Sequence, residues 1–358
     1  MSILFELDYE VRPYRPGDEE QIVPLLQIVF NGWRTLDFWR WKYLDNPFKA
    51  SVVAVGVSDG RIIGVSCTIF KRVKIGDRVI LCSYGTDAGV HPDFRRMGVH
   101  TNISKLKTEL RSKVGVKLNY WATENPILIE HQLNPQHVFP HSLLYFYRIR
   151  DVGLHLRVKP AGTRTRLGLH ALKLLNTLKN AMSPEPPNRD IRISEIQSFD
   201  DGIDAFWDEV KGHHDFIVER TREHLNWSYC DPRAGDFTVK QAEEDGRILG
   251  YIVLETRGGE GYPEAEIVDL LAVPGRLDAA DALLADATRR FDDGGVNFVK
   301  AMVVDGHPYM GLYGRHGFLN VRRKIHVLYY SVPGREAEHK MLESTAAGKV
   351  HLSRGDLI

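Results

Sequence analysis

The chain has 358 residues, of which 43% are hydrophobic and 26% are charged, a balance typical of a soluble globular protein with about two domains. Its 47 lysines and arginines equal its 47 aspartates and glutamates, so no overall basic field favours a nucleic-acid partner. No apolar run approaches the roughly 20 residues of a membrane span, and neither a signal-peptide pattern nor metal-ligand or disulfide spacing of the three cysteines is found, so we expect a cytoplasmic location and no metal.

Two sequence patterns recur along the chain at one offset. Residues 41–47 are similar to residues 227–232, and residues 59–64 are similar to residues 245–250. Both pairs are 186 residues apart, from 41 to 227 and from 59 to 245. Two matches at one offset indicate a tandem duplication of a domain. We therefore predict an N-terminal domain over 1–155, a basic linker over 156–189, a C-terminal domain over 190–332 and a tail over 333–358 that is polar and partly loose.

The first copy alternates short strands and helices. Apolar alternation and turn residues predict strands over 10–14, 52–57, 62–70, 79–90, 116–122 and 143–150, the last of which would close the first lobe. Acidic residues after Gly17 and the pattern of 36–44 predict two early helices, and further helices are expected over 98–112 and from Asn125 onward. In the second copy we expect strands over 191–196, 237–242, 248–254 and 266–273 and a helix over 278–291.

The stretch 87–110 joins a strand to an amphipathic helix through a turn rich in positive charge. The turn carries Arg95, Arg96 and Gly98, and the helix repeats apolar residues at helical spacing from Val99 to Leu110. Backbone N–H groups at a helix N-terminus attract phosphate, and a glycine lets the anion approach closely. The pattern predicts an anion site, although a turn this short also occurs on ordinary surfaces.

Residues 90–99, VHPDFRRMGV, resemble motif A of the GNAT N-acyltransferase superfamily, V-x-P-x-[YF]-[RQ]-x-x-G-x-[GA], with His100 in place of the last small residue. The resemblance implies an α/β (α+β) fold of two tandem GNAT-like lobes, each a twisted, mixed but mainly antiparallel sheet flanked by helices. It also implies that the turn cradles the pyrophosphate of acetyl- or another acyl-coenzyme A. The cofactor-binding residues that it implies are Val90, Arg95, Arg96, Met97, Gly98, Val99, His100 and Asn125.

In this family an amine attacks the thioester directly, which requires a base, an oxyanion donor and an acid. Asp87 is a candidate base on the strand before motif A, and a structural aspartate paired with an arginine is the alternative. Glu124, at the end of the next strand, is a second candidate. Gln132 stands where the family has the tyrosine that acts as the general acid, so the candidates for protonating the thiolate are Tyr145, Tyr147 and water.

The second copy lacks the phosphate turn. Residues 274–278 carry no RxxG pattern, and Asp278 would repel a pyrophosphate. Residues 312–318 do resemble the end of the family's motif B, but without a neighbouring cradle we interpret Tyr313 as a core residue. The second lobe is therefore expected to be degenerate.

The resemblance implies an N-acyltransferase that moves an acyl group from coenzyme A to a primary amine of a small molecule, an amino sugar or a peptide. A non-catalytic acyl-coenzyme A-binding or scaffold protein made of two decayed lobes is the alternative, and an aminoacyl-tRNA donor is a third hypothesis. The aromatic residues Trp33, Phe38, Trp39 and Trp41 either roof the acceptor cleft or form core. The basic linker either packs at a domain joint or lies on an anionic membrane.

Overall fold

The structure, a computed structural model, describes residues 8–32, 35–48, 51–116, 118–125, 139–160, 190–331 and 336–357 and the single residues 162 and 168. The chain forms two compact units. The first comprises Met1–Val73, Arg78–Trp121 and Leu328–His339, and the second comprises Lys74–Asp77, Ala122–Val327 and Lys340–Ile358. Neither unit is therefore one continuous segment of the chain.

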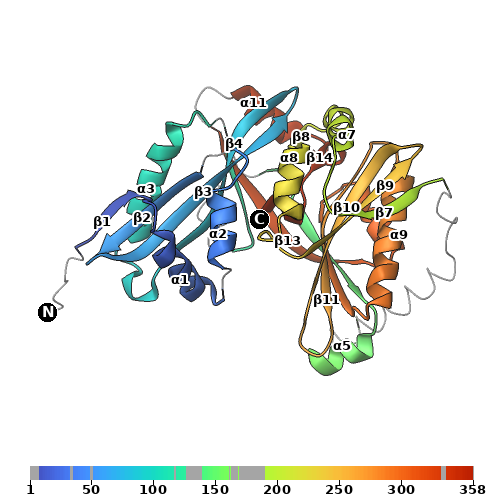
Figure 1. Ribbon diagram of the computed structural model, residues 1–358, viewed down its shortest axis with the longest axis horizontal. Coiled ribbons are helices and arrows are strands. Elements are labelled where there is room, and N and C mark those ends of the chain that lie inside the picture. The colour runs from blue at the N-terminus through green and yellow to red at the C-terminus, as the bar shows by residue number, and fades with distance from the viewer. Residues whose placement is uncertain are drawn as a thin grey trace. The chain divides into compact units, whose positions relative to one another are not determined.

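Strands in the order β1-β2-β3-β4-β5 form the centre of the first unit (Figure 1). β1 and β3 both pair with β2 in antiparallel register, whereas β5 pairs with β4 in parallel. A parallel pair needs a crossover connection, and α3 supplies it. The elements are β1 (Glu10–Pro13), α1 (Glu19–Phe30), α2 (Leu36–Tyr43), β2 (Ser51–Ser58), β3 (Arg61–Ile75), β4 (Arg78–Val90), a 3-10 turn (Pro92–Phe94), α3 (Val99–Ser112) and β5 (Leu118–Thr123).

The helices of the first unit cover both faces of its sheet. A side chain added at Gly89 of β4 would collide with Val29 of α1, whereas the next residue, Val90, packs with Val99 and Ile103 of α3. Successive residues of a strand point to opposite faces. α1 and α3 therefore lie on opposite faces of the sheet, with β4 between them.

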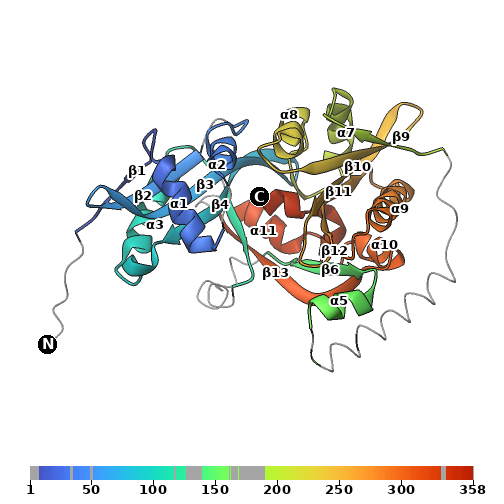
Figure 2. The same ribbon diagram turned by 60° about the horizontal axis from the view of Figure 1, so that its bottom comes forward.

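The second unit is built on strands in the order β13-β6-β12-β11-β10-β9-β7 (Figure 2). Within this strand order, the described residues form one parallel pair, β11 with β12, and α9 connects these two strands. The elements of this half are β6 (Leu143–Ile149), α5 (Val152–Val158), β7 (Arg192–Ile196), α7 (Gly202–Lys211), β8 (Phe216–Val218), α8 (Arg222–Leu225), a π-helical turn (Asn226–Cys230), β9 (Phe237–Glu244), β10 (Arg247–Arg257), β11 (Glu264–Ala272), α9 (Leu277–Asp293), β12 (Phe298–Val304), α10 (Tyr309–Arg315), β13 (Leu319–Ser331), α11 (Glu336–Ser344), a 3-10 turn (Ala347–Lys349), β14 (Val350–His351) and a 3-10 turn (Arg354–Leu357).

Two hydrophobic cores lie on the two faces of the second sheet. Ile252 and Leu254 of β10 belong to the core beneath α9 and α10, while Tyr251 and Val253 belong to the core beneath α7. This alternation is the period of a strand covered on both faces. Mixed, mainly antiparallel sheets flanked by helices are thus present, which confirms the predicted fold class.

The two β-hairpins with Asp-Gly turns have matching bounds. β2 and β9 begin 186 residues apart, at 51 and 237, and they end 186 residues apart, at 58 and 244. Asp59 and Gly60 have φ of 50° and 73°, and Asp245 and Gly246 have φ of 50° and 78°. A two-residue hairpin turn of this type requires two successive residues with left-handed φ. Asp-Gly adopts this conformation with little backbone strain.

The strand predicted over 143–150 is present as β6, but it does not close the first lobe. Its two neighbours are β12 and β13, both from the second half of the chain. Leu144 and Phe146 of β6 pack into the core beneath α9, and the ring of Phe146 lies 5.8 Å from that of Tyr313. Burial against this core, which the local sequence does not specify, decides where β6 pairs.

The prediction of a loose tail is wrong for the described residues after 335. They form α11 and β14, and β14 pairs in parallel with β8. Val350 is fully buried, and Ser353 and Asp356 are nearly so. A polar segment is stable there because charged groups elsewhere in the second unit bind it.

Candidate functional site

The turn after β4 presents free backbone N–H groups. Arg96 and Gly98 both have left-handed φ, at 66° and 76°, and α3 begins directly after them. The first hydrogen bond of α3 runs from the Asn102 N–H to the Gly98 carbonyl, at 3.1 Å. Within the described chain, the N–H groups of Arg96, Met97 and Gly98 have no acceptor. These groups and the first turn of the helix form a row of donors open to an anion.

Two glycines fix the position of this helix end. Gly56 and Gly64 face each other on β2 and β3. A Cβ at Gly64 would lie 2.8 Å from the Ile103 side chain and 3.0 Å from that of Val99, and a Cβ at Gly56 would be only slightly less crowded. The first turn of α3 therefore packs directly on the sheet backbone. This packing holds the N-terminal end of α3, and with it the row of N–H donors, in a fixed position.

The charge and space at the turn also suit an anion. Arg95, Arg96, Met97, Gly98 and His100 are all exposed. Arg95 Nε donates to the Val90 carbonyl at 3.2 Å, and no ion pair to either arginine occurs among the described residues. A Cβ at Gly98 would meet a single atom, the hydroxyl oxygen of Tyr9 at 3.8 Å.

His100, the departure from motif A, does not block the turn, because its side chain is exposed. Partial burial and the positive charge of Lys107 lower the pKa of His100, so the ring is neutral near pH 7. Open space, free amides and unpaired arginines together fit a diphosphate.

The other residues expected at the turn lie in different surroundings. The Val90 and Val99 side chains are buried in the core under α3, so only their backbones can face a ligand. Asn125 is exposed, and its N–H donates to Thr123 Oγ1 at 3.1 Å. The helix expected after Asn125 lies outside the described residues, as do Gln132 and Trp33.

Asp87 lies in β4 with a left-handed φ of 42°, and its carboxylate is ion-paired. Its Oδ2 is 2.7 Å from Lys42 Nζ and accepts a hydrogen bond from the Tyr43 hydroxyl, both from α2. Burial alone would raise the pKa of Asp87, but the Lys42 charge and the hydrogen bonds lower it below its ordinary value. The partner is a lysine, not the arginine that we considered, and the carboxylate is held in its ionised form.

The helix that supplies Lys42 is part of the core. Phe38, Trp39 and Trp41 are at most 4% exposed, and the Trp39 ring lies 5.4 Å from that of Tyr14 and 5.1 Å from that of Tyr43. These three side chains therefore pack inside the first unit. They do not form a ligand wall.

Glu124 and Tyr145, the other two candidate catalytic residues, contact each other in the second unit. The Tyr145 hydroxyl donates to Glu124 Oε1. Arg323 of β13 donates to Glu124 Oε2, at 2.7 Å from Nε, and its guanidinium carbon lies 5.1 Å from the Tyr145 ring centre. Burial, and then the hydrogen bond to Glu124, raise the pKa of Tyr145 well above its ordinary value, so the phenol stays protonated. No signal in the sequence pointed to Arg323, which lies 199 positions from Glu124.

The corresponding turn of the second unit, between β11 and α9, is closed by ion pairs. Arg276 Nη1 lies 2.8 Å from Glu244, and Arg276 Nη2 lies 3.0 Å from Asp278. The predicted acidic residue in the first turn of the helix is thus neutralised by the arginine beside it. No cation is left over at this turn for a phosphate.

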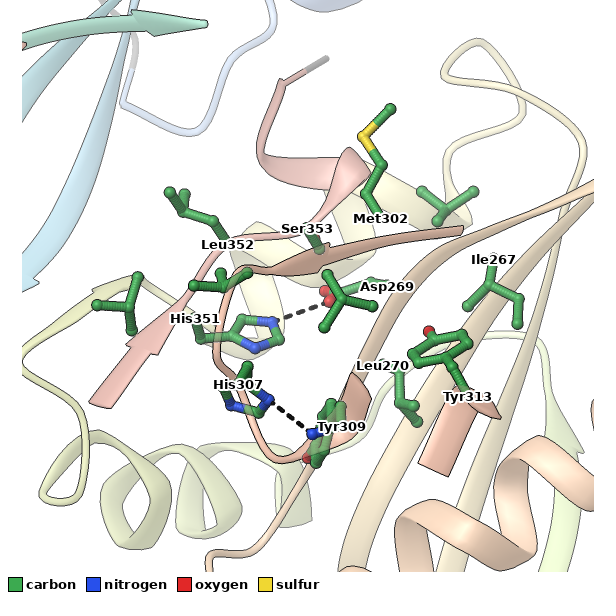
Figure 3. Close-up of a pocket in the computed structure, with 14 residues that line it drawn as sticks. Ile267, Asp269, Leu270, Met302, His307, Tyr309, Tyr313, His351, Leu352 and Ser353 are labelled. Carbon is green, nitrogen blue, oxygen red and sulfur yellow. Dashed lines mark hydrogen bonds and ion pairs between the residues drawn. The ribbon is translucent and has the colours of Figure 1, made fainter. Parts of the chain in front are cut away.

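The fork where β11 and β12 part is filled by the C-terminal segment (Figure 3). The two strands pair only from Glu264 to Ile267 of β11, and Val350–Ser353 lie beside the residues beyond that point. His351 Nε2 is 3.0 Å from the carboxylate of Asp269, which is 1% exposed. The cavity left has a volume of about 20 Å³, room for a single water.

Asp269 also belongs to a buried network of ion pairs and hydrogen bonds. Arg220, 1% exposed, lies 2.8 Å from Asp356 and 3.4 Å from Asp269. The hydroxyls of Tyr229 and Tyr251 donate to Asp269 at 3.1 and 2.8 Å. The predicted core role of Tyr313 agrees with its burial, since it is 3% exposed beneath α9.

Comparisons with known proteins agree with this geometry. Residues 10–127 match the family model for the acetyltransferase (GNAT) domain. The predicted resemblance to GNAT proteins is therefore confirmed for this part of the chain. No curated protein matches the chain in sequence.

Several solved structures share the fold over most of the chain. A protein of unknown function from Enterococcus faecalis, described as a probable N-acyltransferase, has a TM-score of 0.62 at 13% identity and covers 91% of this chain and 73% of its own. The N-myristoyltransferase of Saccharomyces cerevisiae with bound myristoyl-CoA has a TM-score of 0.61 at 11% identity, covering 92% of this chain and 81% of its own. A GCN5-related N-acetyltransferase from Anabaena variabilis has a TM-score of 0.60 at 8% identity, with coverages of 89% and 72%. At such identities the likeness shows the fold.

The described residues lack two kinds of feature. They contain no group of three or more histidine, cysteine, aspartate or glutamate side chains arranged to hold a metal ion. They also contain no helix that is both long and apolar enough to span a membrane.

Proposed function

We propose that the protein transfers an acyl group from an acyl-coenzyme A to a primary amine, and that the turn of residues 95–100 holds the diphosphate of the donor. The observation that carries this proposal is the row of free N–H groups ending at Gly98, beside two unpaired arginines. The match of residues 10–127 to the model of the acetyltransferase (GNAT) domain supports it. The amine belongs to a small molecule, an amino sugar or a peptide.

The turn contributes binding and orientation. Its N–H groups donate to the phosphate oxygens, and Arg95 and Arg96 neutralise their charge. Gly85 of β4 has open space beside its Cα, so the strand leaves room for a chain that extends from the turn along β4. The bound donor supplies a thioester whose C–S bond breaks as the amine nitrogen forms a bond with its carbonyl carbon.

Asp87 is a poor candidate for the proton transfer that this reaction requires. The amine must lose one proton and the leaving thiolate must gain one. Asp87 is held ionised by Lys42 with a lowered pKa, which makes it a weak base. Glu124 and Tyr145, which contact each other in the second unit, stay predictions for the base and the acid. Asp87 instead holds α2 against β4 through Lys42 and Tyr43.

A matched pair of glycine substitutions tests the donor site. Gly98 and Gly275 stand in the two turns that follow β4 and β11, with φ of 76° and 85°, and neither has a close protein neighbour. Aspartate at either position costs about 1 kcal/mol of strain, but only Gly98→Asp places a carboxylate in the proposed diphosphate site. We expect at least tenfold weaker acetyl-coenzyme A binding for Gly98→Asp, measured calorimetrically.

The Gly275→Asp variant is the control and keeps wild-type affinity and a stoichiometry of one donor per chain. Thiol release with a panel of amines then measures turnover and falls in parallel with binding. Equal donor affinity in the two variants, or failure of several acyl-coenzyme A species to bind the wild type, would refute the proposal.

A further inference from the structure

Tyr9 lies beside the turn that we propose as the donor site, one residue before β1 and before the stretch that matches the family model. β1 runs next to α3 (Figure 1). The Tyr9 hydroxyl oxygen is 3.8 Å from the point that a Cβ at Gly98 would occupy. Apart from the residues adjacent to Gly98 in the chain, no other atom of the described residues comes within 4 Å of that point. The phenol therefore borders the open space at the turn.

The position of Tyr9 is fixed by packing and by its neighbours in the chain. Its half-buried ring packs against the core cluster under α3. The carbonyl of Asp8 accepts a hydrogen bond from Ser58 Oγ at 2.8 Å, and Glu10 pairs with Val57 of β2 in antiparallel register. The hydroxyl is therefore held at the turn before any ligand binds, so little conformational freedom is lost when it contacts one.

The Tyr9 hydroxyl has a proton to donate. Asn102 Nδ2 donates to Tyr9 Oη at 2.7 Å, so the oxygen is the acceptor in this hydrogen bond and its own proton points elsewhere. A hydroxyl offers one donor besides its acceptor sites, and no described residue accepts that proton. A hydroxyl that already accepts one hydrogen bond is polarised by it and donates more strongly.

The space that the hydroxyl borders suits an anionic oxygen. A glycine lets an anion approach the backbone closely, and the N–H groups of Arg96, Met97 and Gly98, in the same turn, have no acceptor within the described chain. An oxygen atom between Gly98 and the phenol can lie at the roughly 2.7–2.8 Å that is usual for an O–H···O hydrogen bond. Hydrogen bonds to a charged acceptor are roughly twice as strong as those between neutral groups. A phosphate oxygen is therefore an acceptor that suits the free proton of Tyr9.

We propose that the Tyr9 hydroxyl donates a hydrogen bond to the diphosphate of the acyl donor, and that Asn102 orients the hydroxyl for this contact. The inference rests on the proposed function, because it requires a diphosphate in the turn. It adds to the donor site a side chain from the segment before β1, outside the turn of residues 95–100. Tyr9 is thus a binding residue, and Asn102 is a positioning residue that acts through it.

The experiment compares Tyr9→Phe with Asn102→Ala, which remove the same hydrogen bond from its two sides. Each full-length variant is titrated calorimetrically with coenzyme A and, in competition, with inorganic diphosphate. Tyr9→Phe keeps the packed ring and loses only the hydroxyl, so we expect normal thermal unfolding and at least about tenfold weaker binding of both ligands. Asn102→Ala leaves the hydroxyl in place and should weaken binding by no more than about threefold.

Tyr14→Phe is the matched control, because it removes a hydroxyl that donates to Glu19 at 2.7 Å in the same unit, and it should keep wild-type affinity. Equal losses in Tyr9→Phe and Asn102→Ala would make their hydrogen bond a purely structural contact and overturn the inference. A loss for coenzyme A alone would also overturn it, because the hydroxyl would then contact another part of the donor. If the wild type binds coenzyme A and Tyr9→Phe binds it equally well, only this inference fails. If the wild type binds neither ligand, the proposed function fails with it.

Discussion

The turns after β4 and β11 occupy the same place in two strand–helix–strand crossovers, yet their chemistry is opposite. In the first, Arg95 and Arg96 have no carboxylate partner and the N–H groups before α3 have no acceptor within the described part of the chain. In the second, Arg276 is held between Glu244 and Asp278. Shared topology therefore does not conserve an anion site. Whether such a turn can bind an anion depends on whether the arginines at the helix N-terminus already have carboxylate partners.

The parallel strands beyond the turns differ as well. In the second unit the fork of β11 and β12 is filled by Val350–Ser353, which are anchored through His351 and Asp269. A groove that binds no donor can be stabilised by closing it with the protein's own polar chain. The second unit thus fills with its own chain the fork that corresponds to the one where we propose that the first unit binds its donor. Three predictions test this contrast.

The largest effect is expected for Arg220→Met. Removal of the guanidinium leaves Asp269 and Asp356 buried without their main cation, which typically costs about 3–5 kcal/mol. The free energy of unfolding, measured with denaturant, should fall by that amount. Arg222→Met removes a half-exposed arginine paired with Asp201 and should cost less than about 1 kcal/mol. Similar losses for both variants would show that the buried network does not hold the second unit closed.

A smaller loss in the free energy of unfolding is expected when the pH is lowered. Burial, followed by the charge of His351, lowers the pKa of His214 to about 4, whereas an unfolded histidine titrates near 6.5. Between these values the unfolded chain binds the extra proton, so the stability contributed by neutral His214 is present above pH 6.5 and is lost as pH falls toward 4. The loss is roughly 3 kcal/mol.

Denaturation curves at pH 7, 5.5 and 4 measure this slope. His214→Asn should flatten it, because asparagine can still donate to the Val210 carbonyl but does not titrate. His213→Gln, at the exposed neighbouring histidine, should leave it unchanged. His307, whose pKa burial lowers to about 3, adds a residual slope of the same sign. An unchanged slope in His214→Asn would remove His214 as the cause.

Local features of the fold could be predicted from the sequence because their causes are local. Asp59-Gly60 and Asp245-Gly246 determine their own hairpin turns, and the apolar face of α3 lies in the residues that form it. The turn after β4 could be predicted for the same reason, since Gly98 and its arginines are neighbours in the chain. These features need no information about distant residues.

The features that could not be predicted depend on distant partners. The burial of Asp356 requires Arg220, 136 positions away, and the surroundings of Tyr145 require Arg323. The pairing of β6 with β12 likewise depends on a core assembled from the second half of the chain. A polar tail and an alternating strand are each compatible with several positions. Only the assembled charges and apolar surfaces select one.

The smallest expected effect separates the arginines of the two turns. Arg95→Ala or Arg96→Ala removes one charge from the proposed diphosphate site, and each should weaken coenzyme A binding by about 1–2 kcal/mol, or roughly five- to thirtyfold. The salt dependence of binding should decrease too, because fewer charges attract the phosphates. Arg276→Ala removes the corresponding arginine of the second turn, whose charge is already neutralised by Glu244 and Asp278. It should leave donor affinity unchanged, and if it weakened binding as much as Arg96→Ala, the second turn would be a donor site and the contrast between the two units would be wrong.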